Sequence, residues 1–503
     1  MHLPIVHSFD AVARQEPDAV ALAWHDSQWT LRDLRTAIAA AAAALVDRAL
    51  PRGSRVALLL RNSPQYVALY YGVLAAGCVA VPLNAQERAN VLMRQIEHSE
   101  ASLLIGDPTH PEWSALSSAA ARAQISLIAV QTLDGPDAIE AFAAHVGARS
   151  DTPPDIQLGS DELATIIYTS GTTGRPKGVM LSHGNLAANA AAIIAYLELT
   201  AADRGLCVLP FHFSYGNSVL HSHLLCGAQL VIEDNFAFPH LTLQRMQDCA
   251  ITGFSGVPST FALLLGRCQL RDFDLSRLRY MTQAGGAMPR ALIERLHHEI
   301  PTARLFVMYG QTEATARLTY LPPEQLAAKL GSVGIPIPGV RIEVRGNDQP
   351  VAAGEVGEIC AQGPNVMLGY WRDSDATAKV MCDGWLRTGD LGHRDADGYL
   401  YIDGRAVDMI KVGAFRVSPQ EVEETIAALV GVEEVGVTAI EDEWLGQAIK
   451  AVIVPIKGAL LDVRAVKAHC RERLASYKIP KIVEFAASLP RTSSGKIQRF
   501  KLA

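Results

Sequence analysis

A short stretch of the sequence, residues 168–183, concentrates groups that bind phosphate. It consists of YTSGTTGRPKGVMLSH and contains three glycines, five Ser or Thr hydroxyls and Lys177. Glycines let backbone N–H groups approach an anion closely, and hydroxyl groups add further donors. The hydroxyl donors nearest the glycines are those of Thr169, Ser170, Thr172 and Thr173. The chemistry available to this loop is therefore to hold a phosphate group, with the lysine supplying positive charge.

The segments on either side of this loop indicate where it sits in the fold. Residues 163–168 are apolar and β-branched, which is typical of a buried strand, and residues 186–199 are rich in Ala and Ile, which favours a helix. We therefore expect the loop to connect a strand directly to a helix, where phosphate is often bound. Gly171 and Gly174 are too close together for a Walker A loop. Taken alone, the stretch is equally compatible with a flexible surface loop.

Bulk properties limit the classes of protein to consider. A chain of 503 residues exceeds one ordinary core, which predicts two or more domains. Its net charge of −7 lacks the basic footprint of nucleic-acid binding, so no nucleic-acid partner is expected. The eight cysteines are scattered without a C-x-x-C pair, which argues against zinc or a disulfide framework and fits a reducing compartment.

The sequence also predicts a cytoplasmic protein without a membrane span. The N-terminus has no basic segment followed by an apolar core, so no signal peptide is evident. The most apolar segment, residues 67–85, contains Gly72, Gly77 and Pro82, which favour a helix, a turn and a strand over a transmembrane helix.

Alternating strand-like and helical segments predict an α/β fold with largely parallel sheets over most of the chain. From about Val340 short strands separated by Gly-rich turns indicate a small β-barrel. Beyond Gly404 two helical and three strand-like segments form a compact α+β unit. We therefore predict an N-terminal domain over residues 1–403 and a C-terminal α+β domain over residues 404–503.

Further motifs follow the loop in a fixed order. They are Pro210–Gly216 (PFHFSYG), Tyr309–Glu313 (YGQTE), Gly384–Asp390 (GWLRTGD), Gly404-Arg405 and Pro490–Lys496 (PRTSSGK). With the loop, this set resembles the adenylate-forming superfamily, which contains acyl-CoA synthetases, adenylation domains of nonribosomal peptide synthetases and firefly luciferase. The resemblance extends from Phe9 to Lys496, nearly the entire chain, and the ordered set is far more specific than any single glycine-rich loop.

The resemblance implies a fold and a reaction. The fold is α/β, with a large N-terminal domain of two α/β subdomains plus a small β-barrel, and a small mobile α+β C-terminal domain. The reaction begins when a carboxylate attacks the α-phosphate of ATP, giving acyl-AMP and pyrophosphate, with Mg²⁺ as the metal. Negative charge grows on phosphate oxygens, so the site needs cations and aimed donors. The acyl group then passes to a thiol.

Site residues follow from the same resemblance. Around the phosphates they are Thr169, Ser170, Gly171, Thr172, Thr173, Gly174 and Lys177 for the β- and γ-phosphates, Thr312 for the α-phosphate and Glu313 for Mg²⁺. Around the nucleoside they are Gly286, Ala287, Tyr309 and Gly310 at the adenine, Asp390 at both ribose hydroxyls and Arg405 in support. Lys496 would reach the carboxylate and the α-phosphate together and neutralise the repulsion between them.

Each of these residues also has an ordinary structural explanation. Taken singly, Asp390 is a turn residue, Glu313 an acid at a helix N-terminus and Lys496 a solvated charge. The aromatic residues of the PFHFSYG segment, taken alone, are plain core. Their joint occurrence in family order and spacing favours the catalytic interpretation.

The absence of acidic residues near the PFHFSYG motif restricts which carboxylic acid can be the substrate. Amino-acid-activating relatives pair the substrate ammonium with an aspartate, and no acidic residue lies between Asp203 and Glu233. We therefore expect an acid without a free α-amino group, with an aliphatic or aromatic tail. The lining residues expected by position are His212, Phe213, Asn217, Gly285, Gly286 and Met308. Two histidines, His221 and His223, lack a third metal ligand nearby and are taken as pocket or core residues.

Of two classes of acceptor thiol, coenzyme A is favoured, because no insert of the kind that distinguishes the fatty acyl-AMP ligases is evident, and a carrier protein is the alternative. Coenzyme A makes the chain an acyl-CoA ligase, whereas phosphopantetheine on an acyl or peptidyl carrier protein makes it a stand-alone adenylation enzyme. The last forty residues hold ten Lys or Arg against two Glu, which suits either acceptor. Two departures from the family pattern, Val407 at the hinge and Ala414 beside the thiol tunnel, concern this second step. A non-catalytic nucleotide-binding protein is disfavoured because it would not need Lys496.

Overall fold

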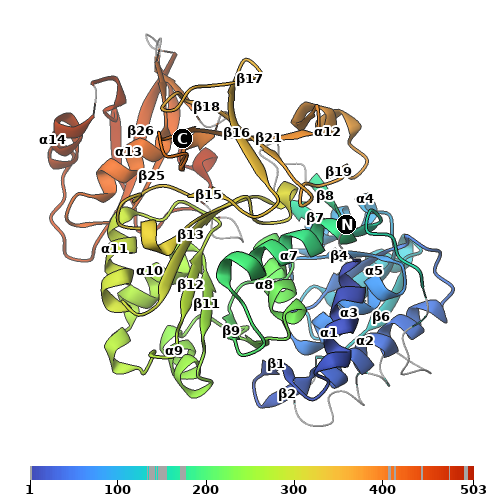
Figure 1. The fold of residues 1–503 in the computed structure, drawn as a ribbon. Coiled ribbons are helices and arrows are strands. Elements are labelled where there is room, and N and C mark those ends of the chain that lie inside the picture. The colour runs from blue at the N-terminus through green and yellow to red at the C-terminus, as the bar shows by residue number, and fades with distance from the viewer. Residues whose placement is uncertain are drawn as a thin grey trace.

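The computed structural model describes residues 3–132, 134, 142, 144, 154, 156–169, 177–405, 409–412, 415–442, 446–474, 476–491 and 497–503. Within these residues the strands form four sheets, two of them large and mostly parallel (Figure 1). The predicted α/β class is confirmed.

The larger parallel sheet forms one half of the N-terminal part. Its strands, in spatial order, are β15 (Ile335–Pro336), β14 (Thr319–Leu321), β13 (Arg304–Tyr309), β12 (Tyr280–Gln283), β11 (Gly253–Gly256), β9 (Arg204–Cys207), β10 (Gln229–Ile232), β1 (Val20–Trp24) and β2 (Ser27–Thr30). The strands from β13 to β1 run parallel, so their carboxyl ends lie at one edge of the sheet.

The second sheet has seven strands. In spatial order they are β19 (Gly369–Tyr370), β8 (Lys177–Ser182), β7 (Leu163–Thr169), β4 (Val79–Pro82), β3 (Arg55–Leu59), β5 (Ala101–Gly106) and β6 (Ser126–Ala129). The strands from β7 to β6 are parallel, whereas β8 and β19 are antiparallel to their neighbours. The apolar segment 67–85 forms part of a helix, a turn and β4, as predicted.

The expectation that the phosphate-type loop joins a strand directly to a helix is wrong. β8 intervenes before the helix and pairs with β7, with Thr169 opposite Lys177. The apolar residues Val179 and Leu181 are fully buried on this strand, and the motif continues through them without a break. The loop is therefore the connection of a β-hairpin, and both ends of it are fixed in the sheet.

Helices cover both sheets in layers. Those between the two sheets are α1 (Ile5–Gln15), α2 (Leu31–Val46), α3 (Pro64–Ala75), α7 (His183–Leu197) and α8 (Ser214–Leu225). Those on the outer faces are α9 (Pro239–Asp248), α10 (Pro258–Arg267) and α11 (Arg290–Glu299) on the larger sheet, and α4 (Ala89–His98) and α5 (Trp113–Arg122) on the other. Successive side chains of a strand point to opposite faces of the sheet. On β12, Tyr280 packs against the helices between the two sheets and Met281 against those on the outer face.

The third sheet is antiparallel and begins where the small barrel is predicted. It consists of β17 (Gln349–Pro350), β16 (Arg341–Gly346), β18 (Gly357–Gln362), β21 (Trp385–Arg394) and β20 (Met381–Cys382), with β22 (Leu400–Arg405) on β21 and α12 (Ser374–Val380) beside it. Its strand order has two ends, so it is an open half-barrel. Glycine-rich turns separate its strands, as the sequence indicates.

The C-terminal residues form the predicted α+β unit with its own core. Its strands are β23 (Ile410–Val412), β24 (Phe415–Val417), β25 (Val432–Asp442), β26 (Gly446–Pro455) and β27 (Ile482–Phe485), and its helices are α13 (Pro419–Ala427) and α14 (Val463–Arg473). The predicted boundary between residues 403 and 404 falls inside β22. The boundary and the mobility of this domain stay predictions.

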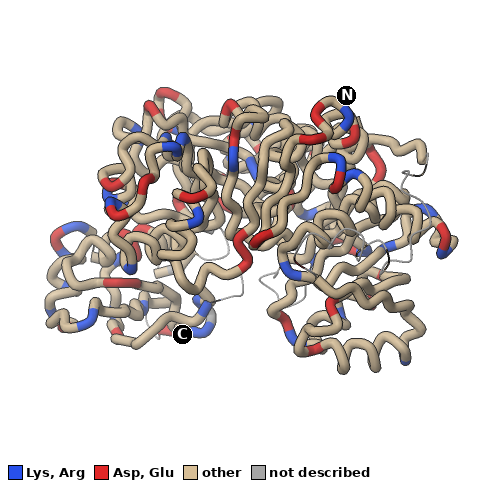
Figure 2. The backbone as a smooth tube through the Cα atoms, turned by 90° about the horizontal axis from the view of Figure 1, so that it is seen from below, with Lys and Arg blue, Asp and Glu red and all other residues tan. Residues whose placement is uncertain are grey.

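Charge and hydropathy add two observations on the described residues. Lys and Arg are interspersed with Asp and Glu along the chain (Figure 2). Among the helices described, none combines the length and apolar character that crossing a bilayer requires.

Candidate active site

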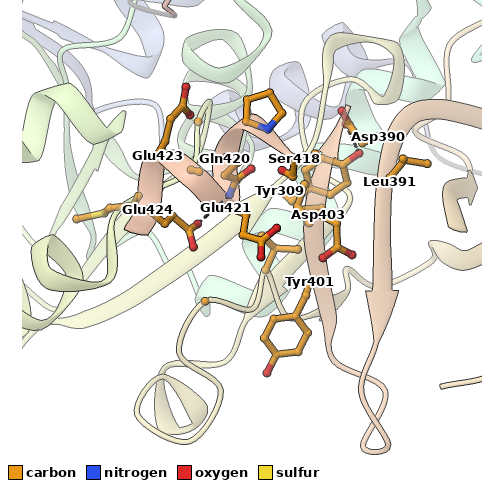
Figure 3. A pocket seen from close by; sticks show the side chains of 18 of the residues that line it. Tyr309, Asp390, Leu391, Tyr401, Asp403, Ser418, Gln420, Glu421, Glu423 and Glu424 are labelled. Carbon is orange, nitrogen blue, oxygen red and sulfur yellow. Dashed lines mark hydrogen bonds between the residues drawn. The ribbon is translucent and has the colours of Figure 1, made fainter. Parts of the chain in front are cut away.

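A cleft of about 1790 Å³ lies at the carboxyl ends of β11, β12 and β13. Its walls include residues just beyond the ends of these strands, among them Val257, Gly285 and Gly310. The half-barrel sheet and the C-terminal domain line the other sides, and Asp390 and Glu421 face the same space (Figure 3). Carboxyl ends of parallel strands are the usual place for ligands in open α/β sheets.

Tyr309 and Asp390 form the best-defined polar pair of the cleft. The Tyr309 hydroxyl at the end of β13 donates a hydrogen bond of 2.6 Å to Oδ2 of Asp390 on β21. Asp390 is only 5% exposed, and its backbone N–H donates a hydrogen bond to Thr388 Oγ1. Asp390 also stands opposite Arg405 in the β21–β22 ladder. A carboxylate held this way is a fixed acceptor beside an aromatic ring.

Two glycines shape the wall around that pair. Gly285 has φ +84°, a conformation that glycine adopts without steric cost, and the next residue, Gly286, accepts a hydrogen bond from the Gln283 side chain. Gly310 has no space for a side chain, because a Cβ there would lie 1.9 Å from the Ala316 carbonyl oxygen. The predicted residues Gly286, Ala287, Tyr309 and Gly310 thus line one cleft together with Asp390.

A second polar group joins the end of the hairpin to the YGQTE segment. Oε1 of Glu313 accepts a hydrogen bond of 2.8 Å from the Tyr370 hydroxyl, and the Lys177 ammonium lies 4.8 Å from the centre of the same ring. Thr312 Oγ1 lies 3.1 Å from Ser214 Oγ at the start of α8. Neither Tyr370 nor Ser214 is among the predicted site residues. Ser214 belongs to the PFHFSYG motif, whereas no sequence signal indicates Tyr370, whose partner is 57 positions away.

The donor set around Glu313 fits magnesium held with substrate oxygens. Mg²⁺ commonly binds one or two carboxylates and completes its octahedron with phosphate oxygens and water. In the described parts of the chain no group of three His, Cys, Asp or Glu side chains forms a protein-only metal site. Glu313, half-buried and oriented by Tyr370, is a suitable carboxylate for such a shared ion.

The predicted acid-pocket residues fall into two sets. Gly285, Gly286 and Met308 line the cleft. His212, Phe213 and Asn217 lie on the segment that leads into α8, outside the cleft lining, and connect to it through the neighbouring Ser214. Burial lowers the pKa of His212 to about 3, so its ring is neutral at pH 7.

Several predicted residues lie outside the described residues. They are Ser170, Gly171, Thr172, Thr173, Gly174 and Lys496, together with the departures Val407 and Ala414. For Arg405 the backbone alone is described. Arg491 and Ile497, which flank the segment carrying Lys496, pair in an antiparallel bridge and both line the cleft.

His221 and His223 are core residues, as expected. His221 Nδ1 lies 2.8 Å from the Tyr71 hydroxyl, and His223 Nε2 lies 2.9 Å from the Tyr280 hydroxyl. Burial lowers the pKa of His221 to about 3 and also lowers that of His223. Both rings are therefore neutral in the folded protein at pH 7.

A neutral buried histidine makes stability depend on pH. Below about pH 6.5 His221 is protonated in the unfolded chain but stays neutral in the folded chain. The free energy of unfolding therefore decreases as the pH falls towards 3. Between pH 7.5 and 5.5 the free energy of unfolding is expected to fall by roughly 1 kcal/mol less in His221→Gln than in wild type. Thermal melts at both pH values measure it, with exposed His240→Gln as control. An equal loss in wild type and His221→Gln would contradict this assignment.

Known protein families and individual relatives match this chain over nearly its whole length. The family model of the AMP-binding enzyme matches residues 9–371, and that of the AMP-binding enzyme C-terminal domain matches residues 421–496. Feruloyl-CoA synthase of an Amycolatopsis species is 36% identical over 488 residues, covering 96% of this chain and 95% of the relative. Indoleacetate–CoA ligase of Aromatoleum aromaticum is 34% identical over 495 residues, covering 97% and 96%.

Solved structures agree over the same length. The o-succinylbenzoate CoA synthetase of Bacillus subtilis, in complex with its acyl-adenylate intermediate, has a TM-score of 0.88 at 29% identity, covering 100% of this chain and 98% of that one. An ATP-bound protein of Rhodopseudomonas palustris, MatB, has a TM-score of 0.89 at 30% identity, covering 100% and 98%. The predicted superfamily is confirmed, and the two family models together with these full-length matches show that this chain belongs to the AMP-binding enzymes of the adenylate-forming superfamily.

Proposed function

We propose that the protein is an AMP-forming acid–thiol ligase that activates a carboxylic acid with ATP and transfers the acyl group to coenzyme A. The observation that carries this proposal is the Tyr309–Asp390 pair in a cleft lined by the larger sheet, the half-barrel sheet and the C-terminal domain. The pair offers an aromatic face for a base and a fixed carboxylate for a ribose. The relatives with CoA-ligase names match along nearly the whole chain.

The first step forms acyl-AMP. An oxygen of the substrate carboxylate attacks the α-phosphorus of ATP, the bond between that phosphorus and the bridging oxygen breaks, and pyrophosphate leaves. In our proposal Thr312 donates to the α-phosphate, while Lys177 and residues 169–174 hold the departing phosphates. Lys496 lies between the two anions and lowers their repulsion. Mg²⁺ held with Glu313 would supply charge neutralisation of the phosphates.

The second step forms the thioester. The thiol sulfur attacks the acyl carbonyl carbon, the bond from that carbon to the phosphate oxygen breaks, AMP leaves and the thiol proton passes to solvent. In the superfamily the C-terminal domain rotates between the two steps, and the small, separately packed core of residues 410–483 suits such a movement. Coenzyme A is favoured over a carrier protein by the names of the relatives.

The acid is proposed to carry no free α-amino group. The segment between Asp203 and Glu233 contributes no carboxylate, and His212 on it is neutral because of its lowered pKa. An ammonium bound there would lack a counter-charge. The aromatic acids in the names of two relatives, ferulate and indoleacetate, fit an aliphatic or aromatic tail.

Tyr370 offers a direct test of the magnesium assignment. We expect Tyr370→Phe to raise the Mg²⁺ concentration needed for half-maximal adenylation by about 10-fold, because Glu313 loses the hydrogen bond that orients it. Saturating Mg²⁺ is expected to restore most of the rate. The measurement is pyrophosphate release at increasing Mg²⁺, with Tyr399→Phe as the matched control. A loss that excess Mg²⁺ does not relieve would assign Tyr370 a different role.

The proposed first step has its own experiment. The purified protein is incubated with ATP, Mg²⁺, labelled pyrophosphate and a panel of carboxylic acids, and acid-dependent appearance of label in ATP is measured. Exchange with acids lacking an amino group, and none with amino acids, is the expected result. Exchange that prefers amino acids would refute the acid class.

A further inference from the structure

Arg317 is held in the core by a strained turn. Thr315, a β-branched residue, has φ +63°, and its hydroxyl donates to the Asn365 carbonyl oxygen at 2.6 Å. The Asn365 side chain in turn donates to the Arg317 carbonyl oxygen at 2.8 Å. The arginine is left 2% exposed. Strain that persists because neighbouring groups hold it is often found at functional sites.

The guanidinium of Arg317 has aromatic neighbours but no carboxylate. Its Cζ lies 4.1 Å from the centre of the Tyr215 ring. Burial raises the pKa of the Tyr196 hydroxyl and the charge of Arg317 opposes that rise, so the guanidinium lies near Tyr196. Across the described residues no ion pair to Arg317 is present, and its Nε has no hydrogen-bond partner. A buried cation without a counter-ion is costly, which indicates that an anion completes the site.

The neighbours of Arg317 connect it to the acid side of the cleft. The Tyr196 hydroxyl donates a hydrogen bond of 3.0 Å to the sulfur of Met308, which lines the cleft. Tyr215 lies on α8, and the Asn217 side-chain amide two residues on is buried and its nitrogen has no hydrogen-bond partner. Met308, an unbranched and adaptable side chain, thus links the cleft to Tyr196, which lies near Arg317.

We propose that Arg317 binds a second oxyanion, a carboxylate or sulfonate, at the far end of the acid substrate. The inference rests on the proposed function, and it narrows the acid to one that carries two negative charges. The first carboxylate reacts with ATP, while the second displaces Met308 and meets the guanidinium, with the Asn217 amide as a further donor. The aliphatic or aromatic tail lies between the two charged groups.

The wild-type protein tests this with matched acids. Each dianion is paired with the same molecule in which one carboxylate is an amide: succinate with succinamate, glutarate with glutaramate, terephthalate with 4-carbamoylbenzoate. Pyrophosphate release gives kcat/KM for each. We expect at least one pair to favour the dianion by about 10-fold or more, since an amide cannot compensate the buried charge. Equal or better use of the amide in every pair would overturn the inference.

Variants separate recognition from structure. Arg317→Met is expected to lose about 10-fold or more on the preferred dianion while its amide partner changes little or improves, and Arg317→Lys is expected to keep part of the preference. Exposed Arg277→Met is the control. An equal fall on both members of the pair would assign Arg317 a structural role and overturn the inference. If Arg317→Met does not fold, the wild-type panel and Arg317→Lys decide.

The two proposals fail in different ways. Activation of singly charged acids without any preference for dianions would overturn the role of Arg317 and leave the ligase proposal standing. Absence of adenylation with every acid, in a protein that melts cooperatively, would contradict the ligase proposal and with it this inference.

Discussion

Replacement of Lys496 by alanine is expected to lower acyl-AMP formation by about 10²–10³-fold or more, with little change in ATP affinity. The reason is electrostatic: the acid and the α-phosphate are both anions, and the proposed lysine is the group that neutralises their approach. In the proposal, ATP would keep its contacts to Asp390, Tyr309 and residues 169–174 in this variant. Single-turnover formation of acyl-AMP and calorimetric binding of a non-hydrolysable ATP analogue measure the two quantities separately.

The second half-reaction supplies an internal control for Lys496. If the C-terminal domain rotates after adenylation, Lys496→Ala supplied with synthetic acyl-AMP and coenzyme A is expected to form thioester at nearly the wild-type rate. The exposed Lys457→Ala variant controls for loss of a surface charge from the same domain. Undiminished adenylation by Lys496→Ala would contradict the proposed role.

Asp390→Ala is expected to raise the KM for ATP by about 10²-fold or more. Hydrogen bonds to a charged acceptor contribute about 1.5–3 kcal/mol each, and the proposal assigns two ribose hydroxyls to this carboxylate. Tyr309→Phe removes the 2.6 Å bond that orients Asp390 and is expected to have a smaller effect, about 10-fold or less. Initial rates over a range of ATP concentrations give both values.

Two comparisons make the Asp390 result specific. 2′-Deoxy-ATP removes one of the proposed bonds, so wild type is expected to bind it less tightly than ATP, whereas Asp390→Ala is expected to discriminate little between the two. The exposed Asp375→Asn variant is the control for loss of a carboxylate charge at the surface. Full discrimination against 2′-deoxy-ATP by Asp390→Ala would show that another group holds the ribose.

Most of the architecture was predictable because strand and helix periods are local properties. The short strands predicted from about Val340 begin with β16 at Arg341, and the α+β unit predicted beyond Gly404 is present. The hairpin strand β8 was missed because its apolar residues continue the loop motif without a turn signal. In residues 168–183 the loop residues run directly into the residues of β8, so the sequence gives no local sign of where the loop ends and the strand begins.

Only those site residues that belong to sequence motifs could be predicted from the sequence. Gly285, Tyr309 and Asp390 meet in one cleft because they follow or lie on strands whose ends converge. The contacts Tyr370–Glu313, Ser214–Thr312 and Arg317–Tyr215 join positions far apart in the sequence, and each of these side chains alone resembles an ordinary core or surface residue. Such contacts require the tertiary structure.

The most direct test of the central claim is mass spectrometry of the products that the purified protein forms from ATP, Mg²⁺, coenzyme A and a panel of mono- and dicarboxylic acids. The account predicts AMP, pyrophosphate and one acyl-CoA in clear excess, with the mass of the acyl group identifying the acid. Acyl-AMP that accumulates without any acyl-CoA would contradict coenzyme A as the acceptor and indicate a carrier-protein thiol. Absence of both products with every acid would contradict the ligase assignment itself.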